Sequence, residues 1–440
     1  MKNCNDKITI HPGLLSGSVT LPISKSITHR VLLGMALQDN QDILNVNLTN
    51  VADDIVRTLN GAKELYRQKL RLQLQLQSQS QLQVQVQSPL KLQSNISQSL
   101  DFEPCKIYCK DSGTTLRMIL PIACALFSQV EISFTEALSK RPLEPLMDVL
   151  QNHGCEFHKE KNNNGSHTLH CKGQFKGGDC YIAGNVSSQF ISGLLYALPI
   201  SKKGGTIHLT TSLASKPYVD MTLAILKDFG IKIYIYEKNG LLVYKIPGKQ
   251  KFKNTQVNFS QGDWSSAAFF AVANALGSQV EMTNLTDNSL QGDREIYSFI
   301  NTIQNSKNPI LDLENHPDLF PILAIFASYK VYDTKFTGIK RLRLKESDRI
   351  AATEAMLSAM GGKLSLVSRG CDGDDYVVVK GMGHLSGGVI DSFQDHRIAM
   401  AAAIGATRAD GDVTILNNNC CKKSYPDFFK DYARLGGKID

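Results

Sequence analysis

Although the 440-residue sequence has ten cysteines, it contains no CxxC pair. Structural zinc sites use closely spaced pairs of cysteine or histidine, so the missing pairs argue against a metal centre of the zinc-finger type. The nearest approach is Cys105 with Cys109, and no second pair or histidine pair accompanies it. We therefore expect no metal site.

Long hydrophobic runs are also absent. No apolar stretch approaches the roughly 18 residues that a membrane-spanning helix needs. The first residues, MKNCNDKITIHPG, lack the apolar segment of a secretory signal peptide. Cysteines without an export signal are typical of a reducing compartment. We expect a cytoplasmic protein with no membrane partner.

A strong excess of charge of either sign is missing. The formal net charge is +7, and the 48 lysine and arginine residues are scattered along the chain. Such a mild balance suits an anionic small molecule at least as well as nucleic acid. Basic residues interleaved with aromatic ones, which would indicate nucleic-acid binding, are not evident. A non-catalytic basic protein that binds nucleic acid is therefore only an alternative, and we expect no nucleic-acid partner.

One pattern, in contrast, recurs about six times. A short, very apolar helix is predicted first, then a strand-like run, and then an amphipathic helix that usually ends at a glycine. The apolar helices are predicted in RVLLGMAL, LRMILPIACAL, SSQFISGLLYAL, WSSAAFFAVANAL, PDLFPILAIFA and HRIAMAAAIGA. Amphipathic partners precede Gly154, Gly230, Gly361 and Gly436, and fainter ones lie in ADDIVRTLNGAKEL and GDREIYSFINTIQ. Six α/β units in a chain of this length favour two domains built by duplication.

One segment departs from the pattern. From Leu70 to Leu100 the sequence has low complexity, with glutamine at every odd position from Gln73 to Gln87. Alternation with a period of two could form an amphipathic strand, but the low complexity favours an expanded, poorly ordered surface loop. We interpret residues from about 68 to 104 as an insertion without a role in the chemistry, since surface insertions cost little. An association segment is the alternative.

Several predicted helices begin with cations or hydroxyls, where the positive end of the helix dipole favours an acid. Lys25, His29 and Arg30 occupy the first turns after Ser24. Comparable entrances occur in DSGTTLRM, GNVSSQF, RLRLKESDRI and DSFQDHRIAM. Any one of them alone is explained by a serine cap or by an ion pair on a solvated helix face. Their repetition predicts a strongly anionic ligand, bound jointly by helix N-termini and cations.

At these residues the chain resembles the 5-enolpyruvylshikimate-3-phosphate synthase (3-phosphoshikimate 1-carboxyvinyltransferase) family of enolpyruvyl transferases. In chain order the similar motifs are LPISKSITHR, DSGTTLR, the RP of KRPLEPLMDVL, NVSSQF, SKPYVDMTL, KESDR, QDHRIAMA and KSYPDFF. Each motif is short, but their order and spacing are specific. The match runs from the first predicted strand to the last helix and leaves out only the glutamine-rich insertion.

The resemblance implies an α/β fold of two similar domains hinged around a central cleft, each with three βαβαββ units arranged as an inside-out α/β barrel. Residues 24–259 would form the shikimate-phosphate-binding domain and contain the insertion. Residues 1–23 together with 260–440 would form the second domain, which carries much of the phosphoenolpyruvate and proton-transfer site.

The resemblance also implies an enzyme, a transferase of the shikimate pathway of aromatic amino acid biosynthesis. It would move the enolpyruvyl group of phosphoenolpyruvate to the 5-hydroxyl of shikimate 3-phosphate and release phosphate. Joining two anions requires many cations, a base near the hydroxyl and an acid near the methylene carbon. These two small molecules are the expected partners; no cofactor is expected, and we expect a monomer.

By resemblance, the expected shikimate 3-phosphate site comprises Lys25, Ser26, Arg30, Ser187, Ser188, Gln189, Ser215, Tyr218, Asp318 and Lys345. The expected phosphoenolpyruvate site comprises Lys25, Gly113, Arg141, Gln189, Arg349, Arg397 and Lys423. The expected catalytic residues are Asp318, Glu346, Lys345 and Lys25.

Within this set we interpret Asp318 as the base for the hydroxyl, and Glu346 as the acid and then the base at C3 of phosphoenolpyruvate. Nearby cations would depress the pKa of a carboxyl group and make an acid role harder. An N-cap of the following apolar helix is the alternative for Asp318. We expect His396 to support Arg397 rather than to act in catalysis.

Two positions depart from the family pattern. Asp111, beside the glycine-containing turn, and Arg341, ahead of KESDR, stand where some relatives carry neutral residues. The carboxylate of Asp111 would need a hydrogen-bond or ion-pair partner. The closest alternative function is enolpyruvyl transfer to UDP-N-acetylglucosamine. That family carries a Lys-Asn pair and a cysteine on a mobile loop, whereas here Ser26 follows Lys25 and no cysteine lies in a comparable loop.

Overall fold

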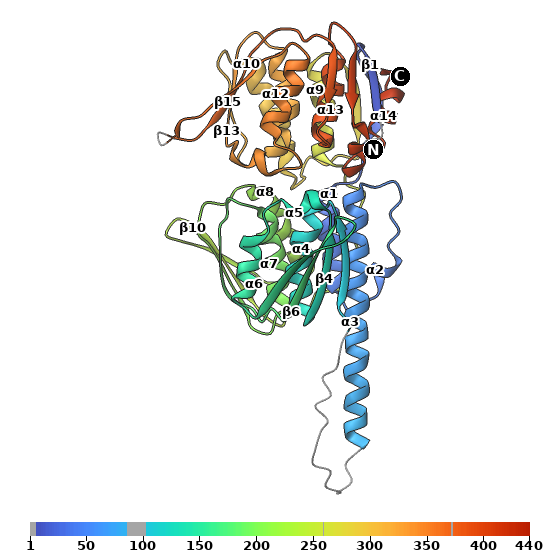
Figure 1. The fold of residues 1–440 in the computed structure, drawn as a ribbon, viewed down its shortest axis with the longest axis vertical. Coiled ribbons are helices and arrows are strands. Elements are labelled where there is room, and N and C mark those ends of the chain that lie inside the picture. The colour runs from blue at the N-terminus through green and yellow to red at the C-terminus, as the bar shows by residue number, and fades with distance from the viewer. Residues whose placement is uncertain (1–5, 86–102, 258, 371–372) are drawn as a thin grey trace.

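The structure, a computed structural model, describes residues 6–85, 103–257, 259–370 and 373–440. Figure 1 shows two stacked α/β lobes. The upper lobe contains the C-terminal part of the chain together with its first strand, and the lower lobe contains the segments between.

Six buried helices supply the centres of the two lobes, and they are the six apolar segments that the repeats predicted. A helix that is hydrophobic on every face must be covered on every face, which places it in the interior. The six helices are α1 (Lys25–Leu37), α4 (Gly113–Leu126), α7 (Ser188–Ile200), α9 (Trp264–Ala275), α11 (Phe320–Ser328) and α13 (His396–Ala406).

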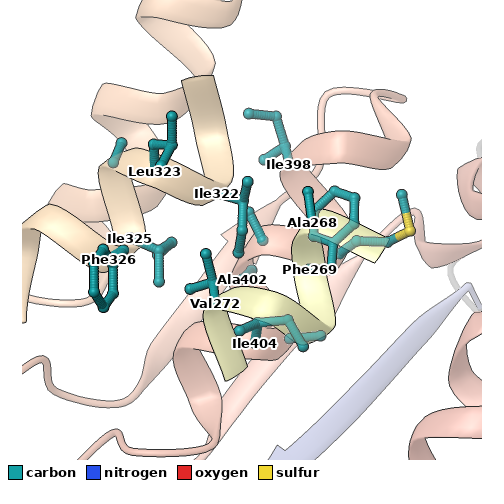
Figure 2. Packing of buried hydrophobic residues seen from close by; sticks show 14 of the residues in the cluster. Ala268, Phe269, Val272, Ile322, Leu323, Ile325, Phe326, Ile398, Ala402 and Ile404 are labelled. Carbon is teal, nitrogen blue, oxygen red and sulfur yellow. The ribbon is translucent and has the colours of Figure 1, made fainter. Parts of the chain in front are cut away.

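Figure 2 shows three of these helices meeting in the core of the upper lobe. Phe269 and Val272 of α9, Ile322 of α11, and Ala402 of α13 come together there, and none of them is more than 1% exposed. The alanine-rich α13 lets its neighbours approach closely, because alanine occupies little space. Helices of three separate units therefore share one core.

Amphipathic partners follow the apolar helices, as the periodicity predicted. Four of them end at a glycine in the left-handed region, with φ of 105° at Gly154, 78° at Gly230, 76° at Gly361 and 92° at Gly436. Only glycine adopts this conformation without strain, so these residues stop the helices. The amphipathic helices are α3 (Asp53–Gln85), α6 (Glu144–Gln151), α8 (Lys216–Asp228), α10 (Ile296–Asn305), α12 (Arg349–Ala359) and α14 (Phe428–Arg434).

Shorter helical segments complete the helices of the described chain. They are the α-helices α2 (Asp42–Asn45) and α5 (Glu136–Ser139), and the 3₁₀ turns η1 (Gly292–Glu295), η2 (Pro317–Leu319), η3 (Lys340–Leu344) and η5 (Asn418–Lys423).

Four of the sheets repeat one topology, in which two parallel strands are extended by two antiparallel ones. In spatial order the first sheet is β3 (Cys105–Lys110), β4 (Gln129–Phe134), β6 (His167–Gly173) and β5 (Cys155–Lys161). The second is β7 (Gly178–Ile182), β8 (Gly204–Leu209), β10 (Leu241–Pro247) and β9 (Tyr234–Lys238). The third is β12 (Ile310–Asp312), β13 (Thr334–Thr337), β15 (Tyr376–Val379) and β14 (Leu364–Val367).

The fourth sheet joins the beginning of the chain to its end. Its order is β16 (Gly388–Asp391), β17 (Val413–Leu416), β1 (Lys7–His11) and β18 (Lys438–Ile439), with β1 antiparallel to both of its neighbours. A two-stranded parallel sheet pairs β2 (Ser16–Thr20) with β11 (Gln279–Thr283). One hydrophobic core consequently joins residues 8–21 to residues 264–435, and a second core is formed by residues 31–252.

The interpretation of the glutamine-rich segment as a loop is wrong as far as residue 85. Helix α3 continues through it, and Figure 1 shows this helix projecting from the lower lobe. Leucine and glutamine have high helix propensity, and no glycine or proline occurs between residues 62 and 88 to end the helix. Because leucines at every second position cannot all share one helical face, Leu74 and Leu76 remain exposed.

The rest of that predicted insertion, residues 86–102, lies outside the described residues. None of the helices in the described part of the chain, α3 included, combines the length and the apolar character that crossing a membrane requires.

Helices α4 and α7 approach closely at Gly193. A Cβ at this position would lie 2.6 Å from the carbonyl oxygen of Arg117 and 2.7 Å from Cγ of Pro121. Gly193→Ala should push the two helices apart and lower the free energy of unfolding by about 1–3 kcal/mol, measured by urea denaturation. Gly13→Ala is the control, because a Cβ there meets nothing within 4 Å. Equal losses in both variants would contradict the close packing.

Candidate active site

One cavity gathers the first turns of eight helices, namely α1, α3, α4, α7, α8, α9, α12 and α13. Seven of these helices carry no acidic residue in the first turn, and the exception is α3, which has Asp53 and Asp54 there. Each contributes the positive end of its dipole, which favours an anion. The cavity encloses about 1020 Å³ of empty space, open solvent at its mouth included. Its lining residues come from both lobes.

Basic side chains outnumber acidic ones two to one in the cavity lining. The four acidic residues are Asp54, Asp263, Asp318 and Glu346. The eight basic residues are Lys25, Arg30, Arg117, Arg141, Arg341, Lys345, Arg349 and Arg397. This excess adds to the field of the helix ends, so the cavity as a whole is suited to ligands with several negative charges.

Arg30 is buried without an acidic partner among the described residues. Its guanidinium donates to Oγ1 of Thr222 at 2.7 Å and to the carbonyl oxygens of Ser26 at 2.7 Å and Tyr218 at 2.9 Å. Burial lowers the pKa of Arg30 to about 10, so the group stays charged at neutral pH. A buried cation held only by neutral oxygens is costly, and an anion in the cavity would offset that cost.

Arg117 repeats this arrangement. It donates to Oε1 of Gln189 at 3.0 Å and to the carbonyl oxygen of Pro142 at 2.9 Å. The amide nitrogen of Gln189 in turn donates to Oγ1 of Thr114 at 2.8 Å. Burial, with the nearby charge of Arg141, lowers the pKa of Arg117 to about 9. A second uncompensated cation therefore lies at the entrances of α4 and α7.

Arg349, in contrast, is fully occupied by carboxylates. Its Nη1 lies 2.5 Å from Oδ1 of Asp318, its Nη2 lies 2.8 Å from Oε2 of Glu346, and its Nε lies 2.9 Å from Oδ2 of Asp395. The side chains of Arg349 and Asp395 are 1% and 0% exposed. One guanidinium fork thus fixes the positions of two acidic groups of the cavity against a third carboxylate behind them.

Asp318 receives three cations. Besides Arg349, Nη2 of Arg397 lies 3.0 Å from Oδ2 and Nζ of Lys345 lies 3.2 Å from Oδ1. Burial alone would raise the pKa of Asp318, but Arg397, Lys345 and Arg349 outweigh it and hold this pKa well below the usual range. The side chain makes no capping hydrogen bond to α11, so the cap alternative does not describe it.

The pKa values of Glu346 and Lys345 are both lowered, but for different reasons. Burial would raise the pKa of Glu346, but Arg141, whose Nη2 is 3.3 Å from Oε1, and Arg349 hold it well below the usual range. Burial lowers the pKa of Lys345 to about 8, against the opposing effect of Asp318. Lys345 is thus the group of this network whose proton is exchangeable near neutral pH.

Comparison with known proteins identifies a family over nearly the whole chain. The family model of EPSP synthase (3-phosphoshikimate 1-carboxyvinyltransferase) matches residues 10–432. The chain is 35% identical to the 3-phosphoshikimate 1-carboxyvinyltransferase of Clostridium novyi (strain NT), over 99% of this chain and 98% of that protein.

The chain belongs to the EPSP synthase family.

Further relatives agree with this result. The 3-phosphoshikimate 1-carboxyvinyltransferase of Methanocorpusculum labreanum is 34% identical over 98% of this chain and 99% of its own length. The structure of EPSP synthase from Acinetobacter baumannii has the same fold, with a TM-score of 0.68 at 20% identity, covering 99% of this chain and 100% of that one. The family resemblance and the α/β fold class predicted from the sequence are confirmed.

The cavity brings together all the predicted site residues but one. The members that line it are Lys25, Ser26, Arg30, Gly113, Arg141, Ser187, Ser188, Gln189, Ser215, Tyr218, Asp318, Lys345, Glu346, Arg349 and Arg397. Lys423 is not among the lining residues. It is the last residue of the 3₁₀ turn η5, whereas most of the others lie at a helix N-terminus or just before one.

Sequence reasoning missed several residues of the cavity wall, among them Asp54, Thr114, Arg117, Asp263 and Ser265. Arg117 was visible as the last residue of the DSGTTLR motif, at one helical turn from Gly113. Asp54 had no signal of its own, because its partner Lys25, at 3.1 Å, is distant in sequence.

His396 also lines the cavity. Neither of its ring nitrogens has a hydrogen-bond partner in the described part of the chain. Its Nδ1 is 3.7 Å from Oδ1 of Asp395, too far for a hydrogen bond. Burial lowers the pKa of His396 well below its usual value, so the imidazole is neutral and retains both a donor and an acceptor for a ligand.

The two departures from the family pattern both have partners. The hydroxyl of Thr135 donates to Oδ1 of Asp111, which supplies the hydrogen bond that this carboxylate requires. Arg341 reaches from the upper lobe to the lower one, where its Nη2 donates to Oγ of Ser215 at 2.7 Å. The same nitrogen donates to the carbonyl oxygen of Glu314, in the upper lobe, at 2.6 Å. Arg341 is therefore part of the cavity wall and of the contact between the lobes.

Replacing Arg349 tests whether the stability of the protein depends on its ion pairs with Asp318, Glu346 and Asp395. Arg349→Met would remove one cationic partner from Asp318 and from Glu346 and would leave the buried Asp395 without an arginine or lysine partner among the described residues. We expect unfolding to become about 3–5 kcal/mol easier in urea at neutral pH. Arg343→Met is the control, since Arg343 is exposed on η3 and should change stability by less than about 0.5 kcal/mol. A loss below about 1 kcal/mol for Arg349→Met would show that the carboxylates do not need this bridge.

Proposed function

We propose that this cavity carries out the reaction for which the family is named. The enolpyruvyl group of phosphoenolpyruvate moves to the 5-hydroxyl of shikimate 3-phosphate, and phosphate is released. The observation that carries the proposal is the pair of buried cations, Arg30 and Arg117, that donate only to neutral oxygens in a cavity with eight basic and four acidic side chains. Two substrates that each carry a phosphate and a carboxylate supply the missing charge.

In this proposal shikimate 3-phosphate occupies the side of the cavity formed by the lower lobe. Serine hydroxyls and the N-termini of α1, α7 and α8 suit a phosphomonoester, because they donate hydrogen bonds without bulk. Arg30 and Lys25 supply charge, and Asp318 with Lys345 reaches the ring from the upper lobe. The remaining contacts are assigned to Ser26, Ser187, Ser188, Gln189, Ser215 and Tyr218.

Phosphoenolpyruvate then lies between the lobes. Gly113 lets its phosphate approach the backbone at the start of α4; an added Cβ there would lie 3.2 Å from Nη1 of Arg141. Arg141 and Arg397 neutralise the phosphate and carboxylate groups, with Lys25 and Gln189 nearby. Arg349 acts by orienting Asp318 and Glu346, because its nitrogens already donate to carboxylates. Lys423 is also assigned to phosphoenolpyruvate, although it is not among the residues that line the cavity.

For proton transfer we assign Asp318 as the base that accepts the proton of the 5-hydroxyl. Its depressed pKa keeps it ionised and therefore ready to accept. Glu346 protonates C3 of phosphoenolpyruvate and later takes a proton back, which completes addition and elimination. Because Arg141 and Arg349 hold Glu346 ionised, this carboxylate must be protonated before it can act as an acid. The arriving anion weakens the field of the two arginines, and Lys345 transfers its proton to Glu346, which passes it to C3.

We further propose that residues 24–259 and residues 1–23 with 260–440 are the two domains. The composition of the two hydrophobic cores supports this division, with residues 31–252 in one core and residues 8–21 and 264–435 in the other. We propose a monomer. We also propose a location in the cytoplasm, which the eight free buried cysteines of the described chain support.

The two enolpyruvyl-transfer functions differ in the substrate that accepts the enolpyruvyl group, so an assay with each acceptor distinguishes them. Phosphate release from phosphoenolpyruvate should occur with shikimate 3-phosphate and not with UDP-N-acetylglucosamine, each offered separately to the purified chain. The reason is that the serine hydroxyls and cations of the lower lobe match a compact phosphomonoester. Turnover with the nucleotide sugar alone would reject the proposal, and tight, steeply salt-dependent binding of RNA without turnover would favour the non-enzymatic alternative.

The role of Lys345 predicts a change in pH dependence. Since burial lowers the pKa of Lys345 to about 8, kcat/KM of the wild type should fall as pH rises through about 8. Lys345→Arg keeps the positive charge but does not titrate in this range, so its lower kcat/KM should show no loss there. An alkaline limb at the same pH in both enzymes would assign that ionisation to another group.

A further inference from the structure

Outside the candidate active site, three cysteines far apart in sequence meet in the core of the lower lobe. Cys124 lies in the last turn of α4, Cys155 begins β5, and Cys171 lies in β6. Their three Sγ atoms all lie within 4.8 Å of one another. The side chains are 0%, 3% and 2% exposed, so the cluster is closed to bulk solvent.

The separation of the sulfurs fits a shared metal ion. Three sulfurs about 2.3 Å from one ion in a plane lie about 4 Å apart. Sγ of Cys124 and Sγ of Cys171 are 3.4 Å apart, and the remaining separations are within 4.8 Å. Shifts of a few tenths of an ångström in these side chains would complete a three-coordinate site. Thiolates select soft metal ions over Mg²⁺ or Ca²⁺.

The surroundings also favour a cation over three free thiolates. Cys124 lies at the carbonyl end of α4, where the helix dipole is negative and attracts positive charge. Cys155 and Cys171 are on adjacent antiparallel strands, and the neighbouring Phe175 is 1% exposed. An ion would neutralise most of the charge of three deprotonated sulfurs in this apolar setting.

We propose that Cys124, Cys155 and Cys171 form a binding site for one soft, thiophilic metal ion, which links the end of α4 to the β5–β6 hairpin. Binding forms three metal–sulfur bonds, and the protons of the thiols pass to solvent. The site is separate from the candidate active site, because none of the three cysteines lines that cavity. Its role is to stabilise the lower lobe, since a ligand that binds only the folded chain raises stability.

Sequence spacing could not reveal this site. The expectation of no metal site depended on the absence of CxxC pairs, whereas Cys124 and Cys171 are 47 residues apart. The one close pair, Cys105 and Cys109, does not belong to the cluster.

The test is a titration of the reduced full-length chain with Cd²⁺ against a competing chelator, followed by the sulfur-to-cadmium charge-transfer absorbance. Wild type should bind one ion per chain with this absorbance, and the Tm should rise. The triple variant Cys124→Ala, Cys155→Ala, Cys171→Ala should lose this ion. The matched control replaces three other buried cysteines of the same core, Cys105, Cys109 and Cys180, by alanine and should retain it.

Equal stoichiometry and affinity in the two triple variants would overturn the proposal. A second measurement covers the case in which the cluster variant does not fold. ¹¹³Cd NMR of the wild type should show one resonance in the range of sulfur-rich coordination, and resonances typical of oxygen or nitrogen ligands alone would also overturn it. Transferase activity of a folded Cys155→Ala variant without metal should equal that of the wild type, because the cluster does not touch the cavity.

Discussion

The structure depends on one electrostatic constraint, the convergence of positive helix ends on a single cavity. Eight helices point their N-termini there, and of these eight only α3 has acids in its first turn. The protein deals with the resulting field in two ways. On the upper-lobe side, Arg349 is neutralised internally by Asp318, Glu346 and Asp395. On the lower-lobe side, Arg30 and Arg117 have only neutral acceptors. The first arrangement positions acid and base groups, and the second leaves charge available for substrate.

This division follows from the repeat. Each unit contributes one helix that is apolar on every face, and such a helix is stable only in the interior. Its first turn must nevertheless emerge somewhere, because its free N–H groups need partners. Helices α9, α11 and α13 pack together in Figure 2, and the first turns of α9 and α13 line the cavity, as does Asp318, two residues before α11. Duplication of a unit therefore duplicates an anion-binding element, and the cavity is a consequence of how the cores are built.

The apolar helices, their glycine stops and most of the cavity lining could be predicted from the sequence, because each depends on local order. Gly230 ends α8 through its own backbone conformation, and Ser187 or Lys25 is placed by the helix that it begins. Features that depend on distant partners could not be predicted in this way. The pairing of Lys25 with Asp54 and the reach of Arg341 to Ser215 exist only in the folded chain. The prediction for the glutamine-rich stretch was wrong for another reason. Its low complexity suggested an unstructured loop, but helix α3 begins before this stretch, with Asp53 and Asp54 in its first turn, and continues into it because no residue there ends the helix.

The candidate metal cluster and the candidate active site share helix α4. Gly113 and Cys124 are eleven residues apart on this helix, which corresponds to about 16 Å along its axis at 1.5 Å per residue. The connection between the two sites in the structure is the packing of α4. Because α4 is buried along most of its length and touches α7 at Gly193, it is a rigid connection. The same rigidity that holds Gly113 and Arg117 at the cavity is what a link at the opposite end of α4 would reinforce.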